Sequence, residues 1–86
     1  MKFKLSRHAT EEMERRSISL LHLESVMDKP QQIVVERDNL KVYQSIIEFG
    51  EKGAFLLRII VDDSIEPVMV ITAYKTSKIS KYWGAL

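Results

Sequence analysis

The chain has 86 residues, of which 45% are hydrophobic, its formal net charge is +1, and it contains no cysteine. This length predicts one domain, residues 1–86, the apolar content argues against a wholly disordered protein, and the lack of cysteine excludes disulfides and thiolate metal sites. No apolar run approaches the roughly 20 residues of a membrane span, and the start lacks the apolar centre of a signal peptide, so we expect a cytoplasmic protein with no membrane partner.

The first third of the sequence predicts a strand and two helices. Residues 2–5 alternate polar and apolar side chains, which indicates a short strand. Ser6 and Ser19 each precede a run with helical spacing, and a serine hydroxyl there can accept a hydrogen bond from a free backbone N–H. We therefore expect helices over about residues 7–16 and from residue 20 up to Pro30, which disfavours the α conformation in the residue before it.

The remaining two-thirds predict four strands and a tail. From residue 31 the apolar period changes to two, which is typical of strands, and turn signals separate the runs. The run over 54–61 is nearly all apolar, so we expect a central strand buried on both faces. Ile79, Tyr82 and Trp83 are at helical spacing, which indicates a short helix or a docked tail. The expected segments are strands over 31–37, 41–49, 54–61 and 67–74 and a tail over 76–86.

This order of elements favours a two-layer α+β fold. Consecutive strands joined by short turns favour an antiparallel meander, and the helices would cover one face of it. We expect the N-terminal strand and two helices to pack on an antiparallel sheet of about four to five strands. The first strand can pair with a late strand, and that pairing would bring Lys2 and Lys4 towards the C-terminal lysines.

The charges are segregated along the chain. Every acidic residue lies between Glu11 and Glu66, where seven bases face twelve acids. The two ends carry bases alone, which are Lys2, Lys4, Arg7, Lys75, Lys78 and Lys81. If folding brings the ends together, these bases form a patch that attracts phosphate.

Three residues of the first helix, His8, Glu12 and Arg16, are spaced four apart and therefore share one row. As a site, the row would use His8 to transfer a proton and Arg16 to contact phosphate. The alternative is a solvated face with an exposed Glu12–Arg16 pair, worth about 0.3–0.5 kcal/mol, and the spacing alone favours this alternative. His22, on the second helix, is given no role.

Arg58 lies inside the apolar run of the central strand. A guanidinium is very costly to bury unpaired, so it must face an acidic residue, a cleft or a bound anion. Phosphate suits it because the planar fork binds two oxygens at once. A structural pair with a glutamate is about as well supported.

The tail from Tyr74 to Trp83 mixes cations, hydroxyls and aromatic rings. Bases of single-stranded RNA can stack on such rings while lysines hold the backbone. In the alternative interpretation, Tyr82 and Trp83 close the core and the lysines only solubilise the end. The sequence contains no zinc-binding cluster, no P-loop and no nucleophile elbow, so we expect neither a metal nor another cofactor.

Several blocks of the sequence have the order and spacing of a small prokaryotic family. The opening reads Ser6-Arg7-His8-Ala9, then Met13, then Arg16-Ser17-Ile18-Ser19, and later blocks lie at 57–61, 70–74 and 81–83. The chain resembles the family called domain of unknown function 4258, which is similar to the BrnT and RelE-like toxins of toxin–antitoxin systems. It departs from the family at Ser17, where glycine is common, and at Glu12, where a base is common. The C-terminal arginine of many RelE-like enzymes is missing.

The resemblance implies a small RNA-cleaving toxin, an endoribonuclease of the mRNA interferase kind, that a cognate antitoxin neutralises. The expected partners are this antitoxin and RNA, and a homodimer is left open. Carried over by position, the catalytic candidates are His8, Arg16, Arg58, Tyr74 and Lys81. The RNA-binding candidates are Lys2, Lys4, Arg7, Lys75, Lys78 and Tyr82.

The mechanism expected for such an enzyme is attack by the RNA 2′-hydroxyl on the adjacent phosphate. His8 would act as base or acid, because a histidine titrates near neutral pH. Arg16, Arg58 and Lys81 would hold the phosphate, and Tyr74 would donate a proton or stack. This hypothesis requires the cations of both chain ends to converge around His8. The alternative is a non-enzymatic module of the same fold that binds an antitoxin-like or other acidic partner.

Overall fold

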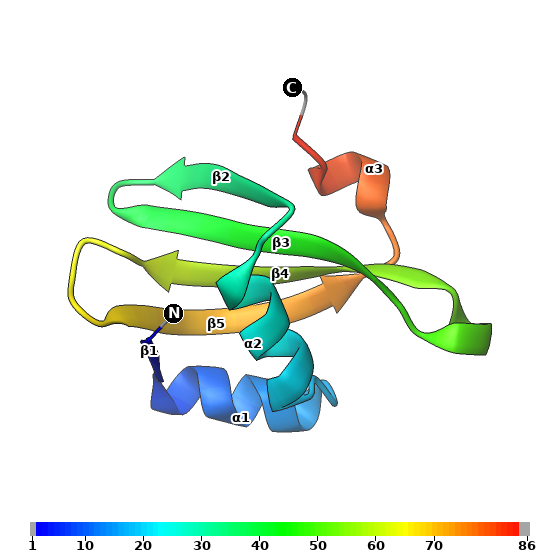
Figure 1. Ribbon diagram of the computed structural model, residues 1–86, viewed down its shortest axis with the longest axis horizontal. Coiled ribbons are helices and arrows are strands. Elements are labelled where there is room, and N and C mark those ends of the chain that lie inside the picture. The colour runs from blue at the N-terminus through cyan, green and yellow to red at the C-terminus, as the bar shows by residue number, and fades with distance from the viewer. Residues whose placement is uncertain (1, 85–86) are drawn as a thin grey trace.

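One five-stranded sheet, with two helices on one of its faces, makes up most of the molecule (Figure 1). The computed structural model describes residues 2–84. The architecture is α+β, as the sequence predicts. In chain order the elements are β1 (Phe3–Leu5), α1 (Arg7–Arg15), α2 (Leu20–Asp28), β2 (Gln32–Arg37), β3 (Leu40–Glu48), the 3₁₀ turn η1 (Gly50–Lys52), β4 (Ala54–Asp62), β5 (Val68–Thr76) and α3 (Ile79–Tyr82).

The sheet is mixed rather than antiparallel throughout. Its strand order is β1-β5-β4-β3-β2, and β2 to β5 form the expected antiparallel meander. β1 does pair with a late strand, but it lies parallel to the start of β5, with Lys4 opposite Met69. The reason is topological. The two helices connect β1 to β2, which lies at the opposite edge of the sheet. The four antiparallel strands β2 to β5 then cross the sheet back towards β1, and the last of them, β5, runs parallel to it.

Serine side chains begin both helices of the covering layer. The Ser6 Oγ accepts a hydrogen bond from the backbone N–H of Ala9 at 2.9 Å. The Ser19 Oγ accepts one from the backbone N–H of His22 at 3.1 Å. Both predicted N-caps are therefore confirmed, because each hydroxyl satisfies a backbone donor that lacks a partner inside the helix.

A Schellman motif ends α1. The backbone N–H of Ile18 donates to the carbonyl of Met13 at 2.9 Å, and Ser17 between them has a φ of +54°. This left-handed conformation favours glycine, since a Cβ is crowded there. It gives a physical reason for the glycine that is common at this position in the resembled family.

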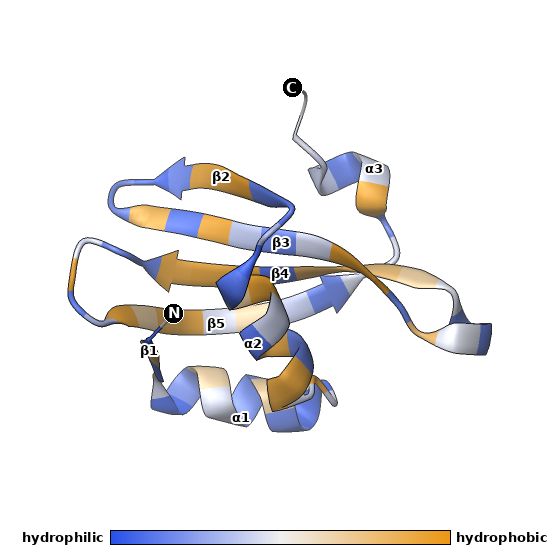
Figure 2. Cartoon of the chain, viewed as in Figure 1, coloured by the Kyte–Doolittle hydropathy of each residue, from blue (hydrophilic) through white to orange (hydrophobic). Residues whose placement is uncertain are grey.

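The apolar core lies between the helices and the sheet. Leu23 of α2 and Ile59 of β4 are fully buried in it, together with Val70 of β5. Figure 2 shows that β4 is hydrophobic along most of its length. The next side chains on the opposite face of β4, Leu56 and Arg58, are buried too. The prediction of a central strand buried on both faces is confirmed.

The C-terminal segment returns to the face of the sheet that α1 and α2 leave uncovered. β5 continues to Thr76, past the predicted end of the strand at residue 74. α3 then forms a single turn, and Trp83 after it is half-buried. The last two residues of the predicted tail lie outside the described residues. Within residues 2–84, no helix is long and apolar enough to cross a membrane.

Candidate functional site

Arg58 lies at the centre of a polar cluster on the face of the sheet opposite α1 and α2. Its direct neighbours across the strands are Gln44 on β3 and Tyr74 on β5. Cross-strand partners point to the same face, so the three side chains stand in a row. The Arg58 Nε donates to the Gln44 Oε1 at 2.8 Å, and its Nη1 donates to the phenolic oxygen of Tyr74 at 2.6 Å.

The guanidinium of Arg58 has no carboxylate partner among residues 2–84. The residue is only 7% exposed, and both of its hydrogen-bond acceptors are neutral. Two aromatic rings face the cation, with centroids 4.4 Å away for Tyr82 and 5.7 Å away for Tyr74. Such cation–π contacts stabilise a charge but do not neutralise it. The expected alternative of a structural pair with a glutamate is therefore wrong.

One nitrogen of this guanidinium has no acceptor among residues 2–84. The hydrogen bonds of Arg58 to these residues use Nε and Nη1, and none uses Nη2. The two N–H groups of Nη2 can therefore donate to an anion.

Two buried glutamines hold the cluster together, and neither was singled out from the sequence. The Gln44 Nε2 donates to the Gln32 Oε1 at 2.8 Å and to the backbone carbonyl of Tyr82 at 3.2 Å. Gln32 also binds Gly84, donating to its carbonyl and accepting from its N–H, both at 3.1 Å. A glutamine between Tyr43 and Ser45 in a buried strand was the available signal, because a buried amide needs partners.

Arg16 reaches the same region from the end of α1. Its Nη1 donates to the backbone carbonyl of Ala73 at 2.8 Å, and its guanidinium lies 5.9 Å from the ring centroid of Tyr74. It can do so because β1 pairs only with the start of β5, which leaves the later edge of β5 open. Arg16, Arg58 and Tyr74 are therefore three catalytic candidates that the fold brings together.

Glu12 anchors Arg16 and is itself buried. Its carboxylate pairs with Arg15 and, at 2.8 Å, with the Nη2 of Arg16. The hydrogen bond from Arg15, helped by the positive charges of Arg15, Arg16 and His8, outweighs desolvation and lowers the pKa of Glu12. The expected Glu12–Arg16 pair is thus present, but the carboxylate is not on a solvated face.

His8 stands apart from the Arg58 cluster. It is exposed, on the first turn of α1, and two turns of helix separate it from Arg16, a rise of about 12 Å. It lies near enough to Glu12 to influence that carboxylate, but the structure records no contact between His8 and Arg58 or Tyr74. The prediction of one cleft centred on His8 is wrong.

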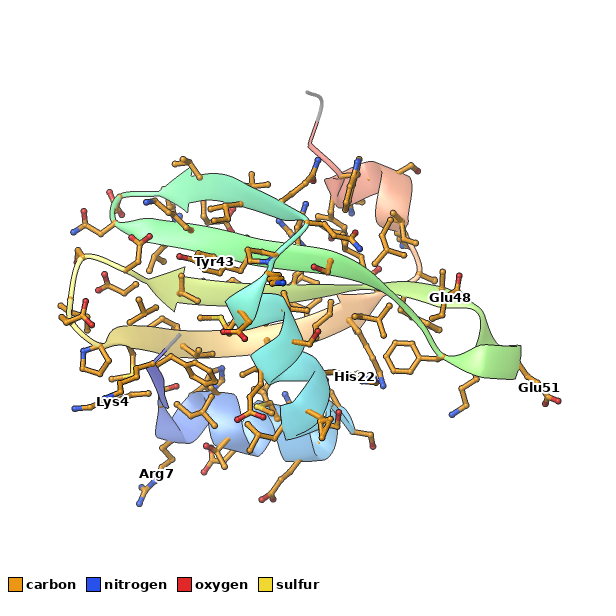
Figure 3. The ribbon with its side chains drawn as sticks, in the orientation of Figure 1. Lys4, Arg7, His22, Tyr43, Glu48 and Glu51 are labelled. Atoms are coloured by element: carbon orange, nitrogen blue, oxygen red, sulfur yellow. The ribbon has the colours of Figure 1, made fainter. Side chains whose placement is uncertain are left out.

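The basic residues of the two chain ends do not converge either. Lys4 lies opposite Met69, whereas Lys75 is six residues further along β5, a separation of roughly 20 Å. Figure 3 shows Lys4 and Arg7 at the β1 end of the molecule, away from α3, and Lys2 belongs to the same end. The expectation failed because the short first strand pairs with the beginning of β5 and not with its end.

The C-terminal candidates divide between the two faces of the sheet. Tyr82 stacks on Arg58, and the Lys81 Nζ lies 5.2 Å from the ring centroid of Tyr82. Lys75 points to the helix-bearing face, where its Nζ donates to the carbonyl of Ser17 at 3.4 Å and lies over Phe49. Lys78 is exposed just before α3. Lys81 and Tyr82 thus join the cluster, and Lys75 does not.

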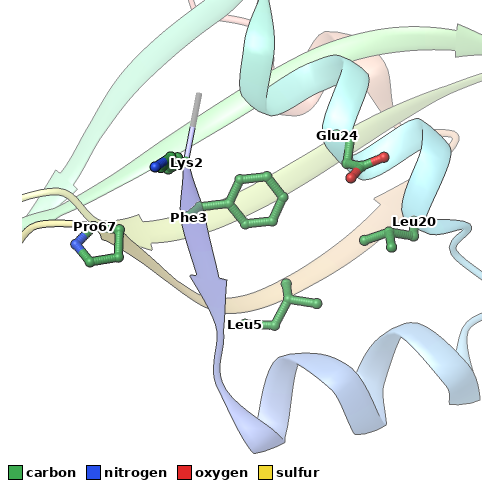
Figure 4. A pocket seen from close by; sticks show the side chains of 6 residues that line it. All are labelled: Lys2, Phe3, Leu5, Leu20, Glu24 and Pro67. Atoms are coloured by element: carbon green, nitrogen blue, oxygen red, sulfur yellow. The ribbon is translucent and has the colours of Figure 1, made fainter.

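Two hollows of the surface lie away from the Arg58 cluster. One is lined by Phe3, Leu5, Leu20 and Pro67 with Lys2 and Glu24 at its rim (Figure 4). A second, between α1 and α2, is lined mainly by apolar side chains. Both are lined mainly by apolar side chains, with two polar residues each, so neither has the set of polar groups expected of a catalytic or binding site. Within residues 2–84, no three histidine or carboxylate side chains gather as a metal site would require.

Comparison with known proteins places the sequence in a family but not beside a characterised protein. Residues 5–75 match the family described as domain of unknown function (DUF4258). No curated protein and no solved structure matches the chain. The matched span includes α1, α2, β2 to β4 and all but the last residue of β5, and with them Arg16, Arg58 and Tyr74 of the cluster. The chain belongs to the DUF4258 family.

Proposed function

We propose that this protein binds RNA at the Arg58 cluster and cleaves it, as a BrnT/RelE-like endoribonuclease toxin. The observation that carries the proposal is the nearly buried Arg58 guanidinium, which faces two tyrosine rings, has neutral hydrogen-bond partners and has no acceptor for Nη2 among residues 2–84. A phosphodiester supplies the negative charge that the described residues do not. Arg guanidinium and aromatic rings together are typical of proteins that hold single-stranded RNA.

The proposed reaction takes its nucleophile from the substrate. The 2′-oxygen of RNA loses its proton to solvent water and bonds to the adjacent phosphorus, while the bond from phosphorus to the 5′-oxygen breaks and that oxygen takes a proton from a donor of the protein, which solvent then reprotonates. The products are a 2′,3′-cyclic phosphate and a 5′-hydroxyl. What remains for the protein is to stabilise the charge that builds up on the phosphate oxygens, which Arg58 would do with help from Arg16 and Lys81.

Tyr74 replaces His8 as the proposed proton donor. Its phenolic oxygen accepts a hydrogen bond from Arg58, so its own O–H is left to donate elsewhere. A donor beside the phosphate can protonate the departing 5′-oxygen, which typically contributes 10²–10⁴-fold to a rate. His8 receives no role in this reaction because of its place on the first turn of α1.

The test compares cleavage of a labelled RNA oligonucleotide with that of its 2′-deoxy counterpart. We expect the protein to cut RNA alone, Arg58→Lys to be at least about 100-fold slower, and Tyr74→Phe to be slower by about 10²-fold or more. Arg37→Lys, an exposed arginine of β2, is the matched control and should cleave like the unchanged protein. Folded Arg58→Lys protein that cleaves at the normal rate would refute the proposal.

A non-enzymatic module is the second candidate. It is favoured by the position of His8, because among residues 2–84 neither a histidine nor a carboxylate contacts Arg58, which leaves the cluster without a general base. On this view the cluster binds a carboxylate of an acidic antitoxin and no RNA is cut. Tight binding of such a partner, without RNA cleavage and without growth arrest on expression, would select this candidate.

A further inference from the structure

We infer that Gln44 positions Arg58 for an RNA phosphate, and that the C-terminal segment completes this anion site through Gln44 and Gln32. The inference rests on the proposed function for the identity of the anion. Its physical basis is independent of RNA, because it follows from the hydrogen bonds of two buried amides.

The Gln44 amide has only one orientation available. A guanidinium offers donors alone, so the Gln44 Oε1 must face the Nε of Arg58. The Gln32 Oε1 and the Tyr82 carbonyl offer acceptors, so the Gln44 NH₂ must face both of them. All three bonds would be lost in the flipped amide. Because Gln44 is fully buried, that loss would not be repaid by water.

A glutamine suits this position because it holds the cation without neutralising it. A glutamate would also accept from the Arg58 Nε, but its negative charge would occupy the guanidinium permanently. It would in addition leave the two acceptors that face Gln44 without a donor. A neutral amide fixes the plane of the guanidinium and leaves its charge for a ligand.

The C-terminal segment belongs to the same hydrogen-bond network that holds Arg58. The ring of Tyr82 covers one side of Arg58 while its backbone carbonyl accepts from Gln44. Gly84 is tied to both ends of the Gln32 amide. The orientation of Arg58 therefore depends on a chain of bonds that runs from Gly84 through Gln32 to Gln44. At the end of this chain of bonds is the positively charged guanidinium of Arg58, and a negatively charged phosphodiester can bind to it.

The test measures affinity for a 2′-deoxy oligonucleotide that cannot be cleaved, as a function of salt. We expect Gln44→Glu to bind at least 10-fold more weakly. The slope of the logarithm of the binding constant against the logarithm of salt concentration should become less steep by about 0.7, which corresponds to the loss of one phosphate contact. Gln31→Glu makes the same charge change beside the cluster and keeps its acceptor for the Ile46 N–H, so its affinity should change less than 2-fold. Equal effects of the two variants would overturn the inference.

A second measurement separates this inference from the proposed function. The Nε–H of Arg58 should give a slowly exchanging NMR signal that disappears in Gln44→Met, and inorganic phosphate should shift it in the unchanged protein but not in Gln44→Glu. A protein that binds no oligonucleotide yet shows these phosphate effects refutes RNA as the ligand and supports the anion site. An Nε–H signal that is unaffected by Gln44→Met or by phosphate overturns the anion site itself.

Discussion

The two faces of β4 are both buried, but different chemistry covers them. On one face Ile59 and Leu23 of α2 belong to one predominantly apolar core. On the other face Arg58 lies under the C-terminal segment in a network of amides and rings. Apolar packing tolerates changes of shape and contributes most of the stability, whereas hydrogen bonds are directional and hold one group in one place. The comparison separates the face that stabilises the fold from the face that presents a charge.

The largest effect on stability is expected on the helix-bearing face. Leu23→Ala should lower the free energy of unfolding by about 2–5 kcal/mol, because Leu23 is fully buried and its loss leaves a cavity. Leu21→Ala is the control, since Leu21 is 75% exposed and should change that energy by less than about 0.5 kcal/mol. Urea denaturation measures both, and similar losses for the two variants would contradict the burial described for α2.

A smaller effect is expected on the polar face. Gln32→Leu should cost about 1–3 kcal/mol, because Gln44 and Gly84 lose their partners while buried or half-buried. It should also release the C-terminal segment, and a shift in the fluorescence emission spectrum of Trp83, the single tryptophan, would show this release. Gln31→Ala, at an exposed position, should leave the emission unchanged. An unaltered emission spectrum in folded Gln32→Leu would show that the segment is held by other contacts.

A gain in stability is expected at the turn between the helices. Ser17→Gly should raise the free energy of unfolding by about 0.5–1 kcal/mol, because the φ of +54° is unfavourable for serine and not for glycine. Ser25→Gly in the middle of α2 makes the same chemical change at a helical φ and should be destabilising. A rise in melting temperature for Ser17→Gly and a fall for Ser25→Gly, measured by thermal denaturation, would confirm this account of the turn.

The smallest effect should be confined to acid. The pKa of Glu12 is lowered below its ordinary value of 4.5, chiefly by the hydrogen bond from Arg15. A carboxyl group whose pKa is lower in the folded state contributes stability above its unfolded pKa and loses it as pH falls through the folded one. The free energy of unfolding should therefore fall with pH below about 4.5, and Glu12→Gln should make that fall shallower. A steeper fall in the variant would contradict the pairing.

Much of the fold was predictable from the sequence because its signals are local. Ser6 and Ser19 act on donors three residues away, and the turns between strands are short. The apolar run around Arg58 indicated a strand buried on both faces, and an arginine inside it indicated a charge with a special partner. Arg16, Arg58 and Tyr74 were each singled out for their own chemistry, and the fold brings them together.

The errors share one cause, which is that pairing register is not a local property. Nothing in residues 2–5 shows whether the first strand lies beside the start or the end of β5. The structure places it at the start, so Lys2 and Lys4 lie far from the C-terminal lysines. The same uncertainty hid the meeting of Gln32 with Gln44, which is a cross-strand contact between β2 and β3.

The sequence by itself determined where helices and strands begin, which faces are apolar, and that one cation had to be buried. Those properties depend on neighbours along the chain and on the cost of moving each side chain out of water. Only the tertiary structure decided what meets that cation: two tyrosine rings and a neutral amide, with no carboxylate among the described residues and with His8 elsewhere. Contacts between distant segments depend on strand order and register, which many sequences with the same local pattern would realise differently.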